Sequence, residues 1–569
     1  MLKRMSLVFT LLMALVGIIG VQAQAVAEPQ SMAQYVPADS EVFFAIRTDG
    51  AFLDELSGII NGVVTKLPPI ISAQAQNLDL KTLLEAQVGS LAETDVGDYV
   101  AVSMSNTVVL YDQDNTNDDD IVFYVVVDLN DRAKFEALFE KSVPNAQKTA
   151  ENGATVYSGP EGSSDQGRLI VQDNLAYLTN TTAVPSGNML SSDGLFANTI
   201  ASLPEPSYNF LVYADFGPLF EALMTQMPAQ STEMFDMMGV DFTQMGPVAM
   251  GGTILDGKAL VIDSYSPSFT AMMPMTGMVD PEFATNIPAG FSFMVHGTDI
   301  KTSANAGLDF IYKANEAQGG SNPIPSREEL NSQLKTFLGI DIDNDILGWM
   351  TGDYALVADL DMMAALDAMD SGNLTDITLA PRFAFIVEGD ASEKPAKVAQ
   401  VIGNLLVAQT KDIPDAPKIT LTTEDSLTTV IIEDVPLSQN PEILVDIEIA
   451  GNGDVFVVGD QETVEAILSG EGDRLTGDAS FVDAQKYILP NASNIAYAGG
   501  EGWGDLITLG GTLAAVSSIS TSNEDDVKAQ MQMMASVFRS GYDIINSSSI
   551  SVSYNADGSQ LSRVVLTLK

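Results

Sequence analysis

The feature that most constrains this fold is a short motif that occurs twice. The stretch VGDYVAVSMS begins at Val96, and a near-copy, TGDYALVADL, begins at Thr351. In each copy, Gly-Asp-Tyr leads into a short apolar strand. We interpret the motif as a turn in which Gly352 relaxes the backbone and Asp353 bonds the local main chain. A catalytic role for Asp98 and Asp353 is the alternative, but turn chemistry favours the structural role.

Five further segments repeat in the same order around this motif. The paired segments begin at Val36 and Ile287, Leu80 and Leu334, Ile121 and Arg382, Asp173 and Gly453, and Ser202 and Ile488. The offset between the copies drifts upward to about 285 residues, as loop insertions would produce. Six matches in one order predict an internal duplication, and a unit of roughly 240 residues is a domain rather than a solenoid repeat.

Each copy has the same succession of predicted strands and helices. Apolar residues alternate from Val42 to Ile46 as in a half-buried strand. In the second copy, Ser326 and Glu329 predict a capping box at the start of a helix, and the last residues predict a hairpin that turns near Gly558. We therefore predict an α+β fold of two internally duplicated domains. Each is expected to be a largely antiparallel twisted sheet with helices packed on one face.

The N-terminus has the layout of a secretory signal peptide. Lys3 and Arg4 precede an uncharged apolar run, Met5–Val21, and small residues follow as far as Ala27. An uncleaved membrane anchor is the alternative, because seventeen uncharged residues are just short of the roughly 20 that a spanning helix needs. The chain is accordingly divided into a signal peptide at 1–27, a first domain at 28–265, a connector at 266–283 and a second domain at 284–569.

Cysteine usage and charge exclude several classes of function. The chain has no cysteine, which excludes disulfides, thiol nucleophiles and cysteine-based metal sites. Loss of Lys3 and Arg4 with the signal takes the net charge from −50 to −52. Such a charge repels nucleic acid and anionic headgroups. We interpret it as a solvated acidic surface suited to a saline or extracellular setting, with cations as candidate partners.

His296 is the single histidine, so a Ser-His-Asp triad would have to include it. No G-x-S-x-G elbow occurs in the chain. The other copy has Ala45 at the matching position. A polar residue on a sheet face is therefore the favoured interpretation of His296, and a catalytic histidine is the alternative.

Three other segments resemble ligand-binding motifs. The acids of Asp112–Asp120 are spaced as in a calcium loop, but Asn117 and Phe123 stand where glycine and glutamate are expected, so a solvated hairpin loop is favoured. The glycine-rich segment Gly499–Asp505 lacks the lysine of a phosphate loop and is interpreted as a strand-to-helix turn. Methionines crowd the segment from 224 to 250 and the segment from 269 to 278. Core packing or a mobile amphipathic flap is favoured there, and a surface for an apolar ligand or partner is the alternative.

Two stretches resemble a known family. YVPADSEVFFAIRTD, from Tyr35, and DILGWMTGDYALVADL, from Asp345, are similar to segments of the bacterial domain-of-unknown-function family 3352. Trp349 and Gly352 match that family's Trp-hydrophobic-Gly segment. The resemblance implies an exported or membrane-anchored protein, and it supplies no catalytic residues.

These observations predict an exported, non-enzymatic binding or interaction protein with a strongly acidic surface. The alternative is a carrier of a lipid or other apolar ligand, held between the sheet and the Met-rich segments. A hydrolase that uses paired acids is a third and weaker hypothesis, because acids are abundant throughout. No catalytic, cofactor-binding or metal-ligating residue is predicted, and no cofactor. The expected location is secreted, periplasmic or at the cell surface, with an N-terminal membrane anchor if the signal is not cleaved.

Overall fold

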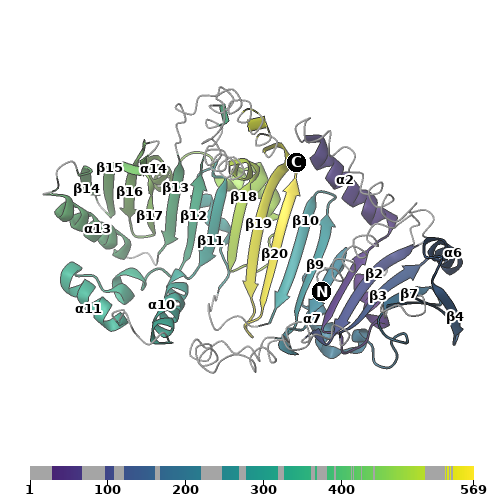
Figure 1. Cartoon of the computed structure of the whole chain (residues 1–569). Coiled ribbons are helices and arrows are strands. Elements are labelled where there is room, and N and C mark those ends of the chain that lie inside the picture. The colour runs from purple at the N-terminus through teal and green to yellow at the C-terminus, as the bar shows by residue number, and fades with distance from the viewer. Residues whose placement is uncertain are drawn as a thin grey trace, which may run out of the picture. The chain divides into compact units, whose positions relative to one another are not determined.

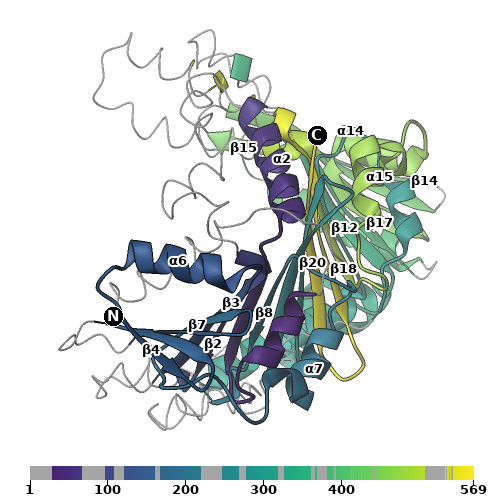
Figure 2. The same cartoon turned by 90° about the vertical axis from the view of Figure 1, so that its right-hand side faces the viewer.

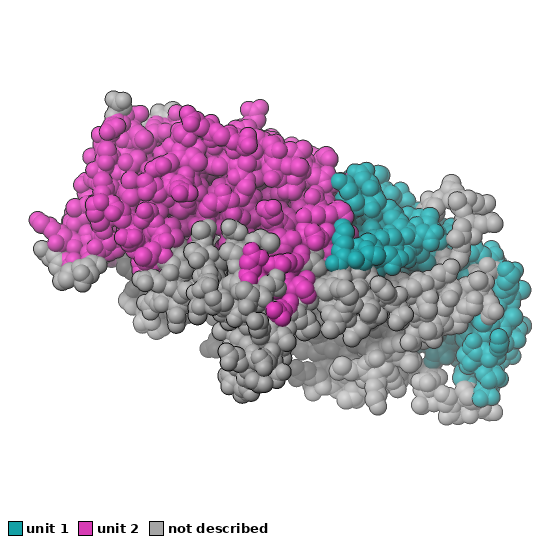
Figure 3. Space-filling model, turned by 90° about the horizontal axis from the view of Figure 1, so that it is seen from above, with its two compact units in different colours: residues 1–232, 241–268 teal, residues 233–240, 269–569 magenta. Residues whose placement is uncertain are grey.

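The fold is described from a computed structural model of the chain (Figure 1). The chain divides into two compact units (Figure 3): unit 1 comprises residues 1–232 and 241–268, and unit 2 comprises residues 233–240 and 269–569. The structure describes residues 28–66, 96–107, 121–159, 167–218, 246–267, 277–317, 326–360, 366–367, 381–389, 393–411, 413, 416–424, 426–439, 442–505, 532, 535–536, 539 and 542–569.

Unit 1 is built on an antiparallel sheet. Its described strands are β1 (Val42–Arg47), β2 (Val96–Ser105), β3 (Val122–Leu129), β4 (Gln147–Glu151), β5 (Ala154–Ser158), β6 (Arg168–Gln172), β7 (Leu175–Thr179), β8 (Phe210–Ala214), β9 (Val248–Leu255) and β10 (Ala259–Ser266). Neighbours pair in the order β4-β5-β6-β7-β3-β2-β1-β8-β9-β10. The first strand in sequence therefore lies near the middle of the sheet, where both of its edges are paired.

Unit 2 is also built on an antiparallel sheet, whose strands lie side by side in Figure 1. They are β11 (Phe293–Thr298), β12 (Asp353–Asp359), β13 (Arg382–Glu388), β14 (Ile419–Glu424), β15 (Leu427–Gln439), β16 (Glu442–Gly451), β17 (Val455–Asp460), β18 (Asn494–Gly499), β19 (Ile545–Tyr554) and β20 (Gln560–Leu568). They pair in the order β14-β15-β16-β17-β13-β12-β11-β18-β19-β20.

The two units have the same strand order. Each strand of unit 1 corresponds to the strand of unit 2 whose label is higher by ten. A small detail repeats as well: Pro37 forms an isolated bridge with Met189, and Pro288 forms one with Arg474 at the corresponding place. Both units therefore share one topology of antiparallel strands. Five of the six repeated segments lead into equivalent strands, whereas Leu334 lies in α11 and its partner segment at Leu80 lies outside the described residues.

Helices cover both faces of the sheet in unit 1. The helical elements are η1 (Pro29–Tyr35), α2 (Gly50–Lys66), α6 (Arg132–Ser142), η4 (Leu190–Ser192) and α7 (Gly194–Ala201). Met32 of η1 and Phe196 of α7 belong to one buried cluster, whereas Phe135 of α6 packs against another that contains Val100 of β2. Accordingly, α6 and α7 lie on opposite sides of the strands in Figure 2.

Unit 2 has the same two-sided arrangement. Its helical elements are η6 (Pro281–Asn286), α10 (Ile300–Ala317), α11 (Arg327–Leu338), the π-helical η7 (Ile342–Ile346), α13 (Lys394–Thr410), α14 (Gln461–Ser469), η9 (Leu475–Gly477) and α15 (Ala479–Gln485). Val464 of α14 and Phe481 of α15 join one cluster, and Val398 of α13 joins the other with Trp349.

The prediction of helices on one face of each sheet is therefore wrong. The physical reason lies in the central strands, which are apolar on both sides. In β2, the adjacent residues Val100 and Ala101 are both fully buried although their side chains point to opposite faces. A strand of this kind needs a cover on each face.

Several local predictions are confirmed. Ser326 and Glu329 form the reciprocal capping box at the start of α11. The C-terminal strands β19 and β20 form a hairpin, and Gly558 lies in its turn with a φ of 86°. Among the residues that the structure describes, no helix is both long enough and apolar enough to cross a membrane. Residues 1–27, which carry the predicted signal, lie outside the described residues.

The turn interpretation of Gly-Asp-Tyr is wrong for the first copy, whereas in the second copy Gly352 lies in a bend directly before the strand. Gly97 lies inside β2 and Gly352 directly precedes β12, and neither has a positive φ. Glycine is needed because the neighbouring strand approaches closely: a Cβ on Gly97 would lie 2.3 Å from Asp128 Oδ2, and one on Gly352 would lie 3.0 Å from the Glu388 carbonyl oxygen. Among the described residues, the main-chain group that donates to the Asp353 carboxylate is the distant Asp280 amide.

Candidate functional site

A cavity of about 480 Å³ lies within unit 2, between the sheet and the short helices of one face. Of its fourteen lining residues, eleven are apolar, among them Met278, Met294, Phe481, Ile488, Leu489 and Ile495. The polar lining residues are His296, Gln485 and Asn491. Its volume and its largely apolar lining are those of a small-molecule pocket.

Local structure explains how these residues meet. In β11, the alternation of a strand places Met294 and His296 on the cavity face and Val295 on the opposite face. Asp280 caps η6 by accepting the Glu282 amide, and Asp478 caps α15. The cavity opens beside Met278, whose side chain is 61% exposed, whereas His296 is only 2% exposed. The histidine therefore lies at the inner end of an apolar pocket.

His296 is held by a buried carboxylate. Its Nε2 lies 2.8 Å from Asp353 Oδ2, and the ring stacks on Phe283 with 4.9 Å between centroids. The same Asp353 oxygen accepts the backbone N–H of Asp280 at 2.5 Å. Asp353 is 6% exposed, so the pair is shielded from water. These contacts fix the ring orientation by hydrogen bonding on one edge and stacking on one face.

The surroundings of this pair are acidic. Glu388, on the neighbouring strand, accepts a hydrogen bond from Asn286 Nδ2 at 2.9 Å. Burial, and then the charge of Asp353, raise the pKa of Glu388. A negative charge added beside His296 would meet the same repulsion and the same poor solvation.

The His296–Asp353 pair has the residue types of two members of a catalytic triad, and the part of the chain that the structure describes adds no third member. No hydroxyl group of a described residue forms a hydrogen bond with His296. Its Nδ1 likewise has no hydrogen-bond partner among the described residues. Chemically, the arrangement offers one oriented hydrogen-bonding atom within an apolar pocket, without a positioned nucleophile.

Unit 1 fills the equivalent place with aromatic side chains. Phe43 meets Phe196 edge to face at 5.6 Å, and Phe196 meets Tyr213 at 5.1 Å. In unit 2 the second contact is kept, with Phe481 and Tyr497 at 5.1 Å. Met294 stands at the strand position of Phe43, and Phe283 of η6 stands where unit 1 has Met32 in η1.

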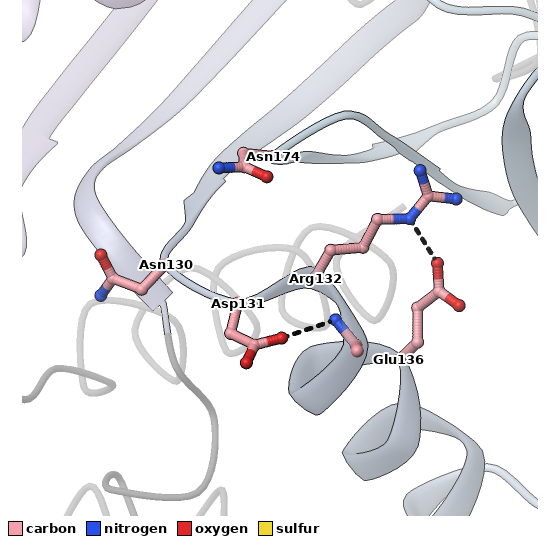
Figure 4. A pocket seen from close by; sticks show the side chains of 6 residues that line it. Asn130, Asp131, Arg132, Glu136 and Asn174 are labelled. Carbon is pink, nitrogen blue, oxygen red and sulfur yellow. Dashed lines mark hydrogen bonds and ion pairs between the residues drawn. The ribbon is translucent and has the colours of Figure 1, made fainter.

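Unit 1 contains a more open and polar pocket of about 450 Å³ at the start of α6 (Figure 4). Arg132 Nε bonds Glu136 at 2.7 Å, and Asp131 caps the helix by accepting the Ala133 amide at 2.9 Å. Asn130 donates to the Val96 carbonyl oxygen. These side chains bond within α6, at its start and to β2, so their polar groups are already engaged in the structure.

A row of exposed apolar residues crosses the other face of the sheet in unit 2. Leu356, Val295, Ile550 and Val564 are joined by successive strand pairings through Ala496. Each of the four leaves between 40% and 50% of its surface exposed. The row is a second apolar feature of unit 2, but it is flat where the cavity is concave.

The remaining sequence candidates are placed only in part. Asp112–Asp120 lies outside the described residues, as does most of the two Met-rich segments. Met278 of the second segment is described and lines the cavity. The predicted strand-to-helix transition at Gly499 is confirmed, since β18 ends there and residues 500–505 are helical. Among the described residues, no cluster of three acidic or histidine side chains could hold a metal ion.

Sequence reasoning missed the partnership of His296 and Asp353. A signal was present, because the two residues lie on segments that repeat next to one another in both copies. Once β11 is paired with β12, His296 faces Ala355, and Asp353 points to the same side two residues away.

Comparison with known proteins gives little functional guidance. No protein with curated annotation matches the chain. Two solved structures, crystal forms I and IV of TP0453, are similar to parts of it. Form I has 10% identity and a TM-score of 0.21, and the alignment covers 43% of this chain and 81% of that one. Form IV has 11% identity and a TM-score of 0.22, with 42% and 83% covered. Scores this low carry no argument about fold or ligand.

The family comparison is more decisive. One family's sequence profile matches residues 5–369, which is more than half of the chain and includes both Gly-Asp-Tyr motifs. The match agrees with the resemblance identified from the segments at Tyr35 and Asp345. The chain therefore belongs to the family described as protein of unknown function (DUF3352).

Proposed function

We propose that this protein is a non-enzymatic, extracytoplasmic binding protein that carries an apolar ligand in the cavity of unit 2. The observation that carries the proposal is the pocket of about 480 Å³ with eleven apolar residues among the fourteen that line it. Strands of the sheet form one side of it, and Met278 of a Met-rich segment contributes to its rim. This is the arrangement expected of the carrier that was the alternative prediction from the sequence.

The non-enzymatic part of the proposal rests on the contacts of His296. A hydrolase triad needs a hydroxyl or thiol nucleophile within reach of the base. His296 is bonded to Asp353 and stacked on Phe283, and the chain has no cysteine. We therefore assign His296 to ligand recognition or packing rather than to bond cleavage.

The extracytoplasmic location rests on the sequence. Residues 1–27 have the layout of a signal peptide, and the net charge of −50 suits a solvated surface in a saline setting. Periplasmic, secreted and cell-surface locations all agree with this argument, as does an N-terminal anchor if the signal is retained. Tracking of the full-length protein by cell fractionation would test it, and recovery in the cytosol would contradict it.

We also propose that the two units arose by duplication of one module. Six segments repeat in order along the sequence, and the two units have the same strand order. In this proposal the first copy kept a filled core at Phe43, while the second acquired a cavity at Met294.

The binding proposal can be tested by native mass spectrometry. Residues 28–569 would be purified without detergent and examined for bound apolar mass. The matched control is Met294→Phe, which introduces the ring that unit 1 has at Phe43 and is expected to fill the cavity. We expect co-purifying ligand on the parent protein and none on the variant. A bare parent protein that also fails to bind added apolar probes would refute the carrier function.

A further inference from the structure

Resting on the proposed function, we infer that the ligand of the unit 2 cavity carries an uncharged hydroxyl group that donates a hydrogen bond to Nδ1 of His296. The ligand class is thus an apolar alcohol, such as a long-chain or polycyclic lipid with a free hydroxyl. The juxtaposition behind this inference is a single oriented imidazole at the inner end of an otherwise apolar pocket.

The hydrogen bond to Asp353 determines which nitrogen of the His296 ring carries the hydrogen. Asp353 Oδ2 accepts the Asp280 amide, and His296 Nε2 lies 2.8 Å away from the same oxygen. An ionised carboxylate only accepts, so Nε2 must carry the hydrogen. A neutral ring is part of what we infer, and its Nδ1 then has a free lone pair and is an acceptor. Because Nδ1 has no partner among the described residues, a donor group on the ligand would satisfy it.

The position of the Nδ1 acceptor in the pocket determines which end of a ligand would enter first. His296 is 2% exposed, whereas Met278 at the rim is 61% exposed and Asn491 is also exposed. The deepest polar atom of the pocket therefore belongs to His296. A ligand would enter with its hydroxyl end first and leave its apolar body against Met294, Ile488 and Leu489.

The negative charge around His296 favours an uncharged ligand head. Asp353, Asp280 and Glu388 lie around the histidine, and the whole chain has a net charge of −50. A carboxylate or phosphate headgroup would enter an acidic, poorly solvated environment. An uncharged hydroxyl group avoids this repulsion and still donates. Unit 1 has Ala45 at the equivalent position and thus no acceptor there, which confines the inference to unit 2.

The test uses the mature chain, residues 28–569, and four twelve-carbon probes: the primary alcohol, its methyl ether, the alkane and the carboxylate. Affinities would be measured by displacement of an environment-sensitive apolar dye. We expect the alcohol to bind about tenfold more tightly than the ether, the difference that one net hydrogen bond provides. In His296→Ala, alcohol and ether should bind equally well, while Ile550→Ala, on the exposed face of the sheet away from the cavity, should keep the preference.

If His296→Ala does not fold, because it leaves Asp353 without its partner, a double variant takes its place. His296→Leu combined with Asp353→Asn removes the buried charge and keeps an acceptor for the Asp280 amide. It too should bind both probes without preference.

The outcomes separate this inference from the proposed function. Equal binding of alcohol and ether by the parent protein would overturn the hydroxyl inference while leaving the carrier intact. Tightest binding of the carboxylate would overturn the assignment of an uncharged head, and would indicate an imidazolium at His296. Retention of the alcohol preference in His296→Ala would show that another group recognises the hydroxyl. Failure of all four probes to bind would instead count against the carrier itself.

Discussion

Units 1 and 2 share a strand order and differ in several core side chains, most clearly on the equivalent strands β1 and β11. In unit 1, Ala45 is fully buried and Phe43 fills the space against Phe196. In unit 2, His296 and Met294 stand on the equivalent strand, and a cavity lies beside them. The comparison teaches that the same backbone pairing can carry core side chains of different size and polarity, and in unit 2 these side chains line a pocket.

The Gly-Asp-Tyr acids show a second difference. In unit 2, the Asp353 carboxylate is paired with His296 and accepts the Asp280 amide. In unit 1, the Asp98 carboxylate has no hydrogen-bond partner among the described residues, and burial, followed by the charges of Asp49 and Asp128, raises its pKa. The nearby Arg47 is engaged with Asp49 in a two-bond ion pair. The carboxylate of the repeated aspartate is thus paired and hydrogen-bonded in unit 2, whereas in unit 1 it lies near other acids that raise its pKa.

The largest expected effect follows from that contrast. Asp353→Ala should lower the free energy of unfolding of unit 2 by roughly 3–5 kcal/mol, because it leaves the buried His296 and the Asp280 amide unpaired. Asp98→Ala should change the stability of unit 1 by less than about 1 kcal/mol. Both tryptophans of the chain, Trp349 and Trp503, lie in unit 2, so fluorescence during urea unfolding reports on that unit. Hydrogen exchange of peptides from β1 and β2 would report on unit 1. Equal costs for the two variants would contradict the contrast.

The next prediction concerns whether the core of unit 1 can accommodate a larger side chain at Ala45. Ala45→His should destabilise unit 1 by roughly 3 kcal/mol, because a larger polar side chain enters a filled core. Ala45→Leu is the control, since it adds similar bulk without polarity. Protection of β1 amides against hydrogen exchange gives the measurement. A cost below about 1 kcal/mol would mean that unit 1 can also form a pocket.

A third contrast concerns a buried acid. Glu448 of β16 is 3% exposed, and its Oε2 has no hydrogen-bond partner among the described residues. The equivalent strand position in unit 1 carries Arg168. Burial, followed by the charge of Glu465 on α14, raises the pKa of Glu448 to about 7. A carboxyl group whose pKa is raised in the folded state favours folding while it is protonated and destabilises once it ionises.

We therefore expect a pH-dependent gain from Glu448→Gln. Between pH 4.5, the ordinary value, and about 7, the stability of the parent protein should fall as the pH rises. At pH 8 the variant should be more stable by on the order of 3 kcal/mol, and the two proteins should be equal near pH 4.5. Tryptophan-monitored urea unfolding across this range is the measurement. A stability gap that does not vary with pH would contradict the assignment to Glu448.

The sequence predicted what depends on local pattern and missed what depends on distant packing. The repeated segments and the apolar alternation from Val42 to Ile46 pointed to equivalent strands, and the capping box at Ser326 was visible in the residues alone. Helices on both faces were missed, although the consecutive apolar residues Val100, Ala101 and Val102 of β2 were a signal for them. The cavity was not predictable, because its lining comes from residues near 280, near 295 and near 485, whose volumes meet only after folding.

The smallest expected change in stability comes from a reciprocal exchange at Phe43 and Met294, two residues that distinguish the cores. Met294→Phe should change the stability of unit 2 by no more than about 1 kcal/mol, because the new ring enters existing space rather than a filled core. Phe43→Met should cost unit 1 about 1 kcal/mol, since it loses the edge-to-face contact with Phe196 while nearly conserving volume. Tryptophan-monitored unfolding measures the first variant and hydrogen exchange of β1 measures the second. If Met294→Phe costs several kcal/mol, the cavity wall cannot accept a ring, and the difference between the units lies in the backbone around η6 rather than in this one side chain.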